Sequence, residues 1–245
     1  MDADINFYFD PVCPFAWMTS KWVRQVQSRR GYTVDWRFIS LRLINAEVDY
    51  DAHFPPEYEA GHTAGLRLLR VAARARAEHG REAMAPLYAA FGAHIFDTAP
   101  VSDDLRTEGE VREFRGTREF AEPMLAEAGL PLELADALGE ESWDLEIRQE
   151  TEEALSLTGR GVGTPIIHFE PPTGVAFFGP VISRLPPEDS AAELWDHVVG
   201  LASFPGFAEL KRSLRERPQL AALGGDVDTV GKQEDWHSGS RRQKK

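Results

Sequence analysis

The nine residues FDPVCPFAW, at positions 9–17, constrain this chain more than any other stretch. Apolar residues alternate over positions 5–9, which predicts a strand, and apolar residues at helical spacing follow the motif. Cys13 therefore falls where a strand becomes a helix. Pro14 suits the first position of that helix, because its fixed φ and its missing N–H group cost nothing there.

A strand–helix junction is a chemically favoured position for a thiol. The first N–H groups of a helix have no partner within the helix, and the aligned peptide dipoles place partial positive charge there. A free cysteine has a pKa near ~8.5, which a helix N-terminus can lower to about 3.5–7.5. We interpret Cys13 as a presented nucleophile; the alternative is a small buried apolar residue. Asp10 is the nearby group that opposes a thiolate.

The first forty residues predict one β-α-β unit. A second alternating run covers residues 34–38, after a helix that ends at Gly31. The two strands are close enough in sequence to lie parallel, joined by a right-handed crossover. Cys13 would then lie at the carboxyl end of the first strand, the edge at which open α/β sheets hold their ligands.

The middle of the chain has a different period. From about residue 51 to residue 158 the apolar spacing is helical, which suggests an insertion into an α/β domain. Strand character returns at residues 165–169 and 175–178, on either side of the turn-forming residues EPPTG, and predicts an antiparallel hairpin. The acidic run at 150–153 has the pattern of a solvated helix face.

The last part of the chain predicts two helices and a tail. Apolar residues at helical spacing place the helices at about 188–203 and 206–215. Beyond Pro218 the sequence becomes polar and rich in glycine. Residues 218–245 are therefore expected to form a disordered tail, clearest from about residue 222 onward.

Composition excludes several classes of function. The chain has 245 residues, a formal net charge of -13 and a single cysteine. One cysteine excludes an internal disulfide and a zinc site built from several cysteines. The charge disfavours nucleic acid and anionic membranes as partners. There is no run of eighteen or more apolar residues and no secretion-signal pattern, so neither a membrane span nor secretion is predicted, and a cytoplasmic location is expected.

Metal and nucleotide sites are not expected either. The seven histidines show no metal-ligand spacing, and no glycine-rich phosphate loop follows a strand. His62 and His94 have the pattern of solvated histidines on helices.

The element order resembles the thioredoxin fold in its DsbA-like form. Two motifs carry that resemblance: FDPVCPFAW at 9–17 and GVGTPIIHF at 161–169. In addition, VAFFGPVIS at 175–183 and FPGFAELKR at 204–212 are similar to actinobacterial DsbA-like proteins named mycothiol-dependent nitroreductases. The resemblance covers almost everything from residue 5 to residue 218.

This resemblance implies both a fold and an activity. The fold is an α/β thioredoxin-like domain made of residues 1–50 and 160–217, with a helical domain of residues 51–159 inserted into it. The activity is that of a cytoplasmic oxidoreductase, often a homodimer. Such a protein uses a low-molecular-weight thiol, here mycothiol, and takes disulfides or electron-poor small molecules as substrates. The family places a cis-proline beside its active cysteine, and Pro165 after Thr164 is similar to that residue.

The chain departs from the family pattern at one critical position. Where the family has Cys-Pro-Trp-Cys, this chain has Cys13, Pro14, Phe15 and Ala16. Because Ala16 replaces the resolving thiol, the chain cannot release a mixed disulfide by internal attack. The remaining route is monothiol chemistry, in which Cys13 attacks a mixed disulfide and a second small thiol regenerates it.

The residues expected around Cys13 come from both parts of the fold. The residue before the cis-proline exposes backbone groups that bind an extended thiol by strand-like hydrogen bonds. An aromatic residue such as Trp17 can stack a flat substrate, although a core position is the alternative. The predicted thiol and substrate contacts are Pro14, Phe15, Trp17, Asn45, Tyr58, Thr164 and Pro165.

Two other functions remain open at this level. One is a transferase or isomerase similar to the kappa-class glutathione transferases, which activate a bound thiol without redox turnover. The other is a binding protein that lost catalysis together with its second cysteine.

Overall fold

The computed structural model describes residues 3–99, 106–212, 215–225, 233–234, 236–237 and 240–241. At its centre is a four-stranded sheet in the order β2-β1-β3-β4. The parallel β-α-β unit and the antiparallel hairpin predicted from the sequence are both confirmed. The strands are β1 (Ile5–Phe9), β2 (Val34–Phe38), β3 (Ile166–Phe169) and β4 (Ala176–Phe178), with β1 parallel to β2, antiparallel to β3, and β3 antiparallel to β4.

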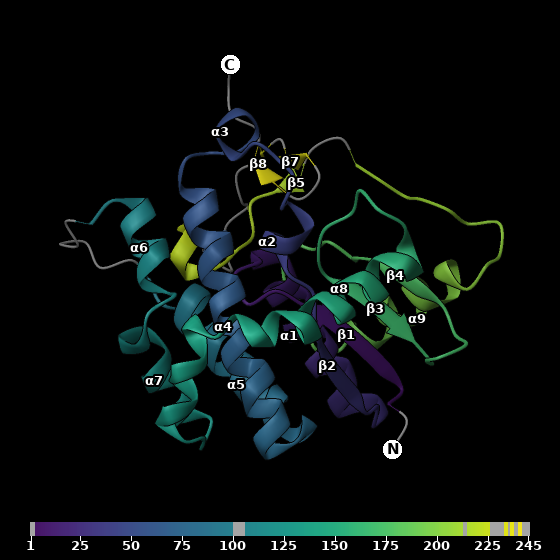
Figure 1. Ribbon diagram of the computed structural model, residues 1–245. Helices are drawn as coiled ribbons and strands as arrows, with labels where there is room; N and C mark the ends of the chain where they lie inside the picture. Colours follow the sequence, from purple (N-terminus) through teal and green to yellow (C-terminus); the bar gives the residue numbers. More distant parts are fainter. Residues whose placement is uncertain are drawn as a thin grey trace.

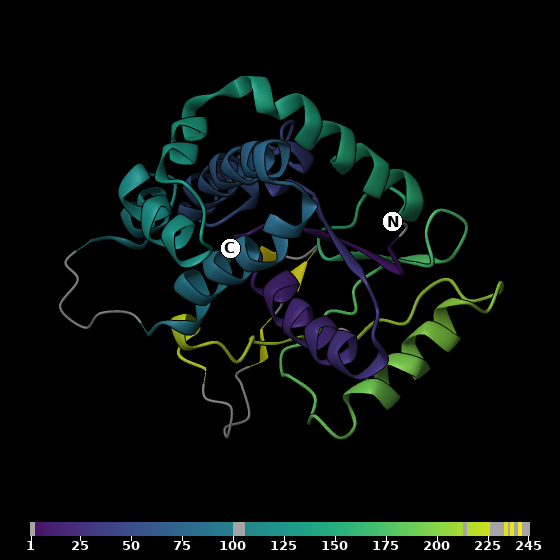
Figure 2. The same ribbon diagram turned by 90° about the horizontal axis from the view of Figure 1, so that it is seen from below.

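Helices cover both faces of this sheet. Figure 2 shows α1 (Pro14–Arg30) and α9 (Ala191–Ala202) on one side and α8 (Asp144–Thr158) on the other. On the first side, Trp22 of α1 packs edge-on against Trp195 of α9 at 5.7 Å between ring centres. The Trp22 indole N–H also donates to the Ala191 carbonyl at 2.9 Å. The two helices are thereby fixed to each other over the sheet.

The predicted helical block is present between β2 and β3, and Figure 1 shows it as the blue and teal helices beside the sheet. Its longest member, α4, lies at the centre of the block and packs against most of the other helical segments. The elements are α2 (Leu41–Ile44), α3 (Tyr50–His53), α4 (Glu57–His79), η1 (Arg81–Ala83), α5 (Met84–Gly92), η2 (Ala93–Asp97), α6 (Glu108–Phe114), α7 (Arg118–Glu127), η3 (Leu132–Gly139), η4 (Glu141–Trp143) and α8.

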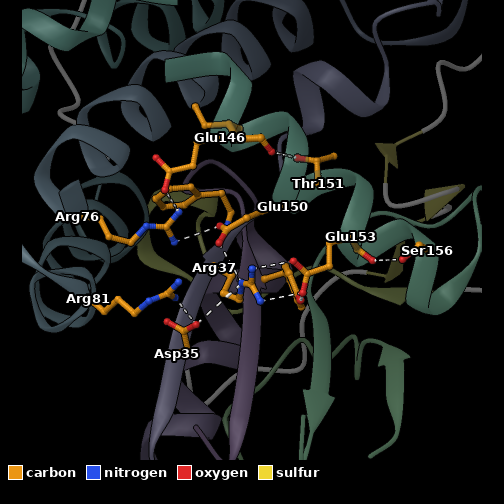
Figure 3. A network of polar contacts seen from close by, with 12 residues as sticks. Asp35, Arg37, Arg76, Arg81, Glu146, Glu150, Thr151, Glu153 and Ser156 are labelled. Carbon is orange, nitrogen blue, oxygen red and sulfur yellow. Dashed lines mark hydrogen bonds and ion pairs between the residues drawn. The ribbon is translucent and has the colours of Figure 1, made fainter. Parts of the chain in front are cut away.

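A buried ionic network holds α8 against the sheet and against α4 (Figure 3). The Glu150 carboxylate accepts hydrogen bonds from Arg37 of β2 at 3.0 Å, from Arg76 of α4 at 3.1 Å and from the Phe38 backbone N–H at 2.8 Å. Arg37 also donates two bonds to Glu153, at 2.8 and 2.7 Å. The acidic run on α8 is therefore only partly the solvated face expected from the sequence: Glu152 is exposed, whereas Glu150 is buried against two arginines from distant segments.

The region after α9 also differs from the expectation. Residues 206–212 form no helix, and Arg215–Glu216 is the short strand β5. Residues 208–212 are exposed, with Leu210 81% exposed, so a helix there would have no surface on which to bury its apolar side chains.

Residues 218–225 differ from the tail expected there. Pro218, Gln219 and Leu220 are buried, and η5 (Ala221–Leu223) contacts η2. The rest of the expected tail lies outside the described residues, apart from β6 (Gln233–Glu234), β7 (Trp236–His237) and β8 (Ser240–Arg241). The division into a discontinuous domain and an inserted one stays a prediction.

None of the helices in the described ranges combines the length and the apolar character needed to cross a membrane.

Candidate functional site

Cys13 is the N-cap residue of α1. Its backbone is extended, with φ -88° and ψ 113°, and its sulfur accepts a hydrogen bond from the Ala16 N–H at 3.4 Å. The thiol donates to the Thr164 carbonyl oxygen at 3.5 Å. The contact with the N–H group stabilises a thiolate, whereas the contact with the carbonyl stabilises the protonated thiol. The two contacts hold the sulfur between α1 and the loop before β3.

The local sequence explains this placement. β1 ends at Phe9, and the Cys13 N–H donates to the Asp10 carbonyl at 3.1 Å, which turns the chain into the helix. Pro14 occupies the first helical position, as predicted. Leu41 and Val181 pack against the small apolar cluster that contains Cys13, and only 6% of Cys13 is exposed.

The loop before β3 faces the cysteine, as the resemblance implies. The peptide bond between Thr164 and Pro165 is cis. Thr164 is buried, and its hydroxyl donates to the Tyr8 carbonyl at 3.0 Å, which fixes the loop to β1. Two motifs about 150 residues apart in the sequence therefore meet at one edge of the sheet.

Asp10, three residues before Cys13, is a buried acid. Its two carboxylate oxygens accept hydrogen bonds from the Val12 N–H at 3.0 Å and from the Leu41 N–H at 2.7 Å. Burial raises the pKa of Asp10 to about 7, although both hydrogen bonds favour the charged form. Below that pH the carboxyl is largely neutral, so its opposition to a Cys13 thiolate is weakest there.

Trp17 lies in the core rather than on a binding surface. It is 4% exposed, and its indole N–H donates to Asp97 at 3.2 Å. Its ring packs edge-on against Tyr88 and lies directly over Gly92. Trp17 is therefore a core residue, which was the alternative to a stacking role.

Asn45 and Tyr58 lie in different surroundings. Asn45 ends α2, and its side-chain amide donates to the carbonyl of Leu41, the residue that packs on the Cys13 cluster. Tyr58 belongs to a buried aromatic cluster with Tyr50, Phe54 and His62 at the start of α4. Asn45 thus bonds a residue that packs against the Cys13 cluster, whereas Tyr58 packs within the aromatic cluster.

His62 is the residue in this region that sequence reasoning misjudged. It is 6% exposed, and its Nδ1 lies 2.9 Å from the Tyr50 hydroxyl. Burial, with smaller contributions from the positive charges of Arg112 and Arg42, lowers the pKa of His62 to about 3. The aromatic residues at positions 50, 54 and 58 are the sequence signal that a histidine at 62 would be enclosed, since they share its helix or precede it closely.

The buried His62 predicts a pH-dependent stability. An unfolded histidine has a pKa near ~6.5, so the unfolded chain takes up a proton more readily than the folded one. The stability that neutral His62 contributes is complete above about pH 6.5 and is lost as the pH falls toward 3. We expect the difference in unfolding free energy between the wild type and His62→Gln, from urea titrations, to shrink between about pH 7 and pH 5.

The control for this prediction is His94→Gln. His94 lies at the surface beside Glu127, so its substitution should cost little at every pH. A difference between the wild type and His62→Gln that does not change with pH would contradict the prediction.

An open groove of about 1350 Å³ begins beside the Cys13 cluster. Phe15, Gly163 and Val181 are among its lining residues, together with β4 and residues 207–212, whereas Cys13 itself is not. The groove thus borders the apolar cluster that contains Cys13. Among the described side chains, no group of three or more His, Cys, Asp or Glu residues is placed to hold a metal ion.

A Cys-Pro helix start that faces a cis-proline loop, on this sheet and with this helical insertion, defines a thioredoxin-like protein of the DsbA type. Residues 12–212 match the Rv2466c-like family, described as mycothiol-dependent nitroreductase Rv2466c, and the chain belongs to that family. Membership places it among the thiol-dependent oxidoreductases.

Two known proteins are similar to most of the chain. One is the Mycobacterium tuberculosis protein named "Uncharacterized protein Rv2286c", 30% identical over 97% of this chain and 93% of the relative. The other is the crystal structure of the probable DsbA oxidoreductase SCO1869 from Streptomyces coelicolor, 14% identical, which covers 88% of this chain and 97% of that chain with a TM-score of 0.49.

Proposed function

We propose that this protein is a monothiol oxidoreductase in which Cys13 exchanges disulfides with a low-molecular-weight thiol, and that this thiol is mycothiol. The observation that carries the proposal is the position of the Cys13 sulfur, between the Ala16 N–H and the Thr164 carbonyl. Family membership supports the choice of thiol. We further propose a cytoplasmic location and a homodimer, both of which rest on the family resemblance alone.

The reaction balances with one protein thiol. The Cys13 thiolate attacks the sulfur that the small thiol RSH contributes to a mixed disulfide X–S–S–R. A new Cys13–S–S–R bond forms, and X–S⁻ leaves and takes up a proton. A second RSH, as its thiolate, then attacks the R sulfur on Cys13, forming R–S–S–R and restoring the Cys13 thiolate. In total, X–S–S–R and RSH become XSH and R–S–S–R, with no need for a second cysteine at position 16.

The surrounding residues take defined parts in this proposal. Backbone groups at Thr164 hold the thiol beside the sulfur, Pro165 fixes the position of that backbone, and Pro14 and Phe15 form the apolar wall next to it. Asn45 supplies a polar contact from the other side. Trp17 and Tyr58 shape the site from the core and from the aromatic cluster.

The family match also favours a second reaction, the reduction of an electron-poor small molecule. Two molecules of RSH supply two electrons and two protons, which convert a nitro group to a nitroso group and water while R–S–S–R forms. In the first step the Cys13 thiol and one RSH give two electrons and two protons to the nitro group and become Cys13–S–S–R. A second RSH then attacks the R sulfur, which releases R–S–S–R and restores the Cys13 thiol, so this reaction uses the same residues.

The decisive measurement is the intact mass of the reduced protein after exposure to mycothiol disulfide between about pH 5 and pH 9, with Cys13→Ser as the control. We expect one mycothiol adduct on the wild type below pH 7, none on Cys13→Ser, and removal of the adduct by free mycothiol. An adduct that forms only as the pH approaches the ordinary cysteine value of about 8.5 would contradict the proposal and favour a binding protein. Consumption of thiol without any disulfide product would favour the kappa-class alternative.

A further inference from the structure

Residues 216–225, which we name the strap, lie beyond the part of the chain that matches the family, which ends at residue 212. They are nevertheless closely packed. Pro218, Gln219 and Leu220 are all buried. Because the family match does not cover this closely packed segment, we consider a separate function for it.

One end of the strap is fixed to the loop after β4. Glu216 accepts hydrogen bonds from the Ser183 hydroxyl at 2.7 Å and from Arg184 Nε at 2.8 Å. The Gln219 N–H donates to the Ser183 carbonyl at 2.8 Å. This loop also holds Val181, which packs against the Cys13 cluster.

The other end of the strap is fixed to the helical insertion. Leu220 is 2% exposed and belongs to the main hydrophobic core, and Leu223 packs against the same core. The short helix η5 lies against η2, the segment that ends at Asp97. The strap therefore joins the two parts of the fold.

The start of α1 lies between these two anchor points. On one side, the Thr19 hydroxyl donates to the Pro180 carbonyl at 2.7 Å. On the other, Trp17 and Lys21 both donate to Asp97, at 3.2 and 2.6 Å. Figure 1 shows the yellow-green chain crossing the end of the molecule at which β1 finishes and α1 begins, and Figure 2 agrees.

We propose that the strap is a specificity element that limits access to Cys13 to low-molecular-weight disulfides and thiols. Its anchor residue Glu216 lines the same groove as Phe15 and Val181, which lie in or against the Cys13 cluster, and Cys13 is only 6% exposed. A polypeptide carrying a disulfide needs more room beside the sulfur than a single small thiol does. This inference rests on the proposed reactivity of Cys13.

The test compares two reagents with the same reactive group and different sizes, N-ethylmaleimide and a polyethylene-glycol maleimide of several kilodaltons. The variants are a chain that ends at Arg212, which lacks the strap, and a control chain that ends at Gly225, which keeps it. Removal of the strap is expected to raise the ratio of the large-reagent rate to the small-reagent rate at least about tenfold. That change corresponds to about 1.4 kcal/mol in the activation free energy of the large reagent relative to the small one. The control chain should keep the wild-type ratio.

A second pair of variants tests the role of the strap in the full-length chain, without truncation. Leu220→Ala weakens the buried anchor, whereas Leu210→Ala removes the same side chain at a position that is 81% exposed. Of these two variants, only Leu220→Ala is expected to raise the ratio of the large-reagent rate to the small-reagent rate. Far-UV circular dichroism should confirm that both variants are folded.

Unchanged ratios in both the shortened chain and Leu220→Ala would overturn the role of the strap. Slow reaction of N-ethylmaleimide even without the strap would instead overturn the reactivity of Cys13 itself. The two failures are therefore distinguishable.

Discussion

Replacing Glu150 by alanine is expected to lower the free energy of unfolding by about 1–3 kcal/mol, because it removes a buried acceptor shared by two arginines and a backbone N–H, although Arg37 keeps Glu153 and Arg76 keeps Glu146. Arg37 and Arg76 both donate to this carboxylate, and so does the Phe38 N–H. Only 5% of Glu150 is exposed, so water cannot replace the lost bonds without opening the contact between α8 and the sheet. Urea unfolding followed by circular dichroism measures the loss.

The matched control lies on the same helix. Glu152 pairs with Arg160 at the surface, with both side chains at least half exposed, so Glu152→Ala should cost less than about 1 kcal/mol. Glu150→Gln keeps one acceptor and should fall between the two. A loss for Glu150→Ala no larger than that of the surface control would show that the network does not hold α8.

Replacing Gly92 by alanine is expected to destabilise the protein by about 1–3 kcal/mol and to slow the alkylation of Cys13. A Cβ at this position would lie 2.1 Å from Cε3 and 2.3 Å from Cζ3 of the Trp17 ring, distances that require one of the two helices to move. Trp17 belongs to the first turn of α1, so displacing it moves the Ala16 N–H group that donates to the Cys13 sulfur. Thermal unfolding and the rate with N-ethylmaleimide measure the two effects.

An ordinary helical glycine would behave in the opposite way. Gly200 lies in α9, and a Cβ added there would meet no heavy atom within 4 Å, so Gly200→Ala should be neutral or stabilising, by up to about 1 kcal/mol. If Gly92→Ala behaves like Gly200→Ala, the close contact with Trp17 does not exist in solution.

The sequence alone determined the parts of the fold that depend on local patterns. The change from an alternating to a helical period around Cys13 placed the cysteine at the start of α1, because each period reflects one repeating backbone geometry. The same reasoning located the hairpin of β3 and β4. The pairing of Cys13 with Pro165 came from the resemblance, since nothing local to either motif refers to the other.

Only the tertiary structure decided which polar and apolar residues are enclosed. Glu150 and His62 have the pattern of solvated helix residues, and each is buried by partners that come from other elements. The segment 206–212 has helical spacing but no surface to pack against, whereas the polar, glycine-rich strap finds anchors at Ser183 and in the core. Burial depends on contacts between distant segments, and a periodic pattern in one segment contains no information about them.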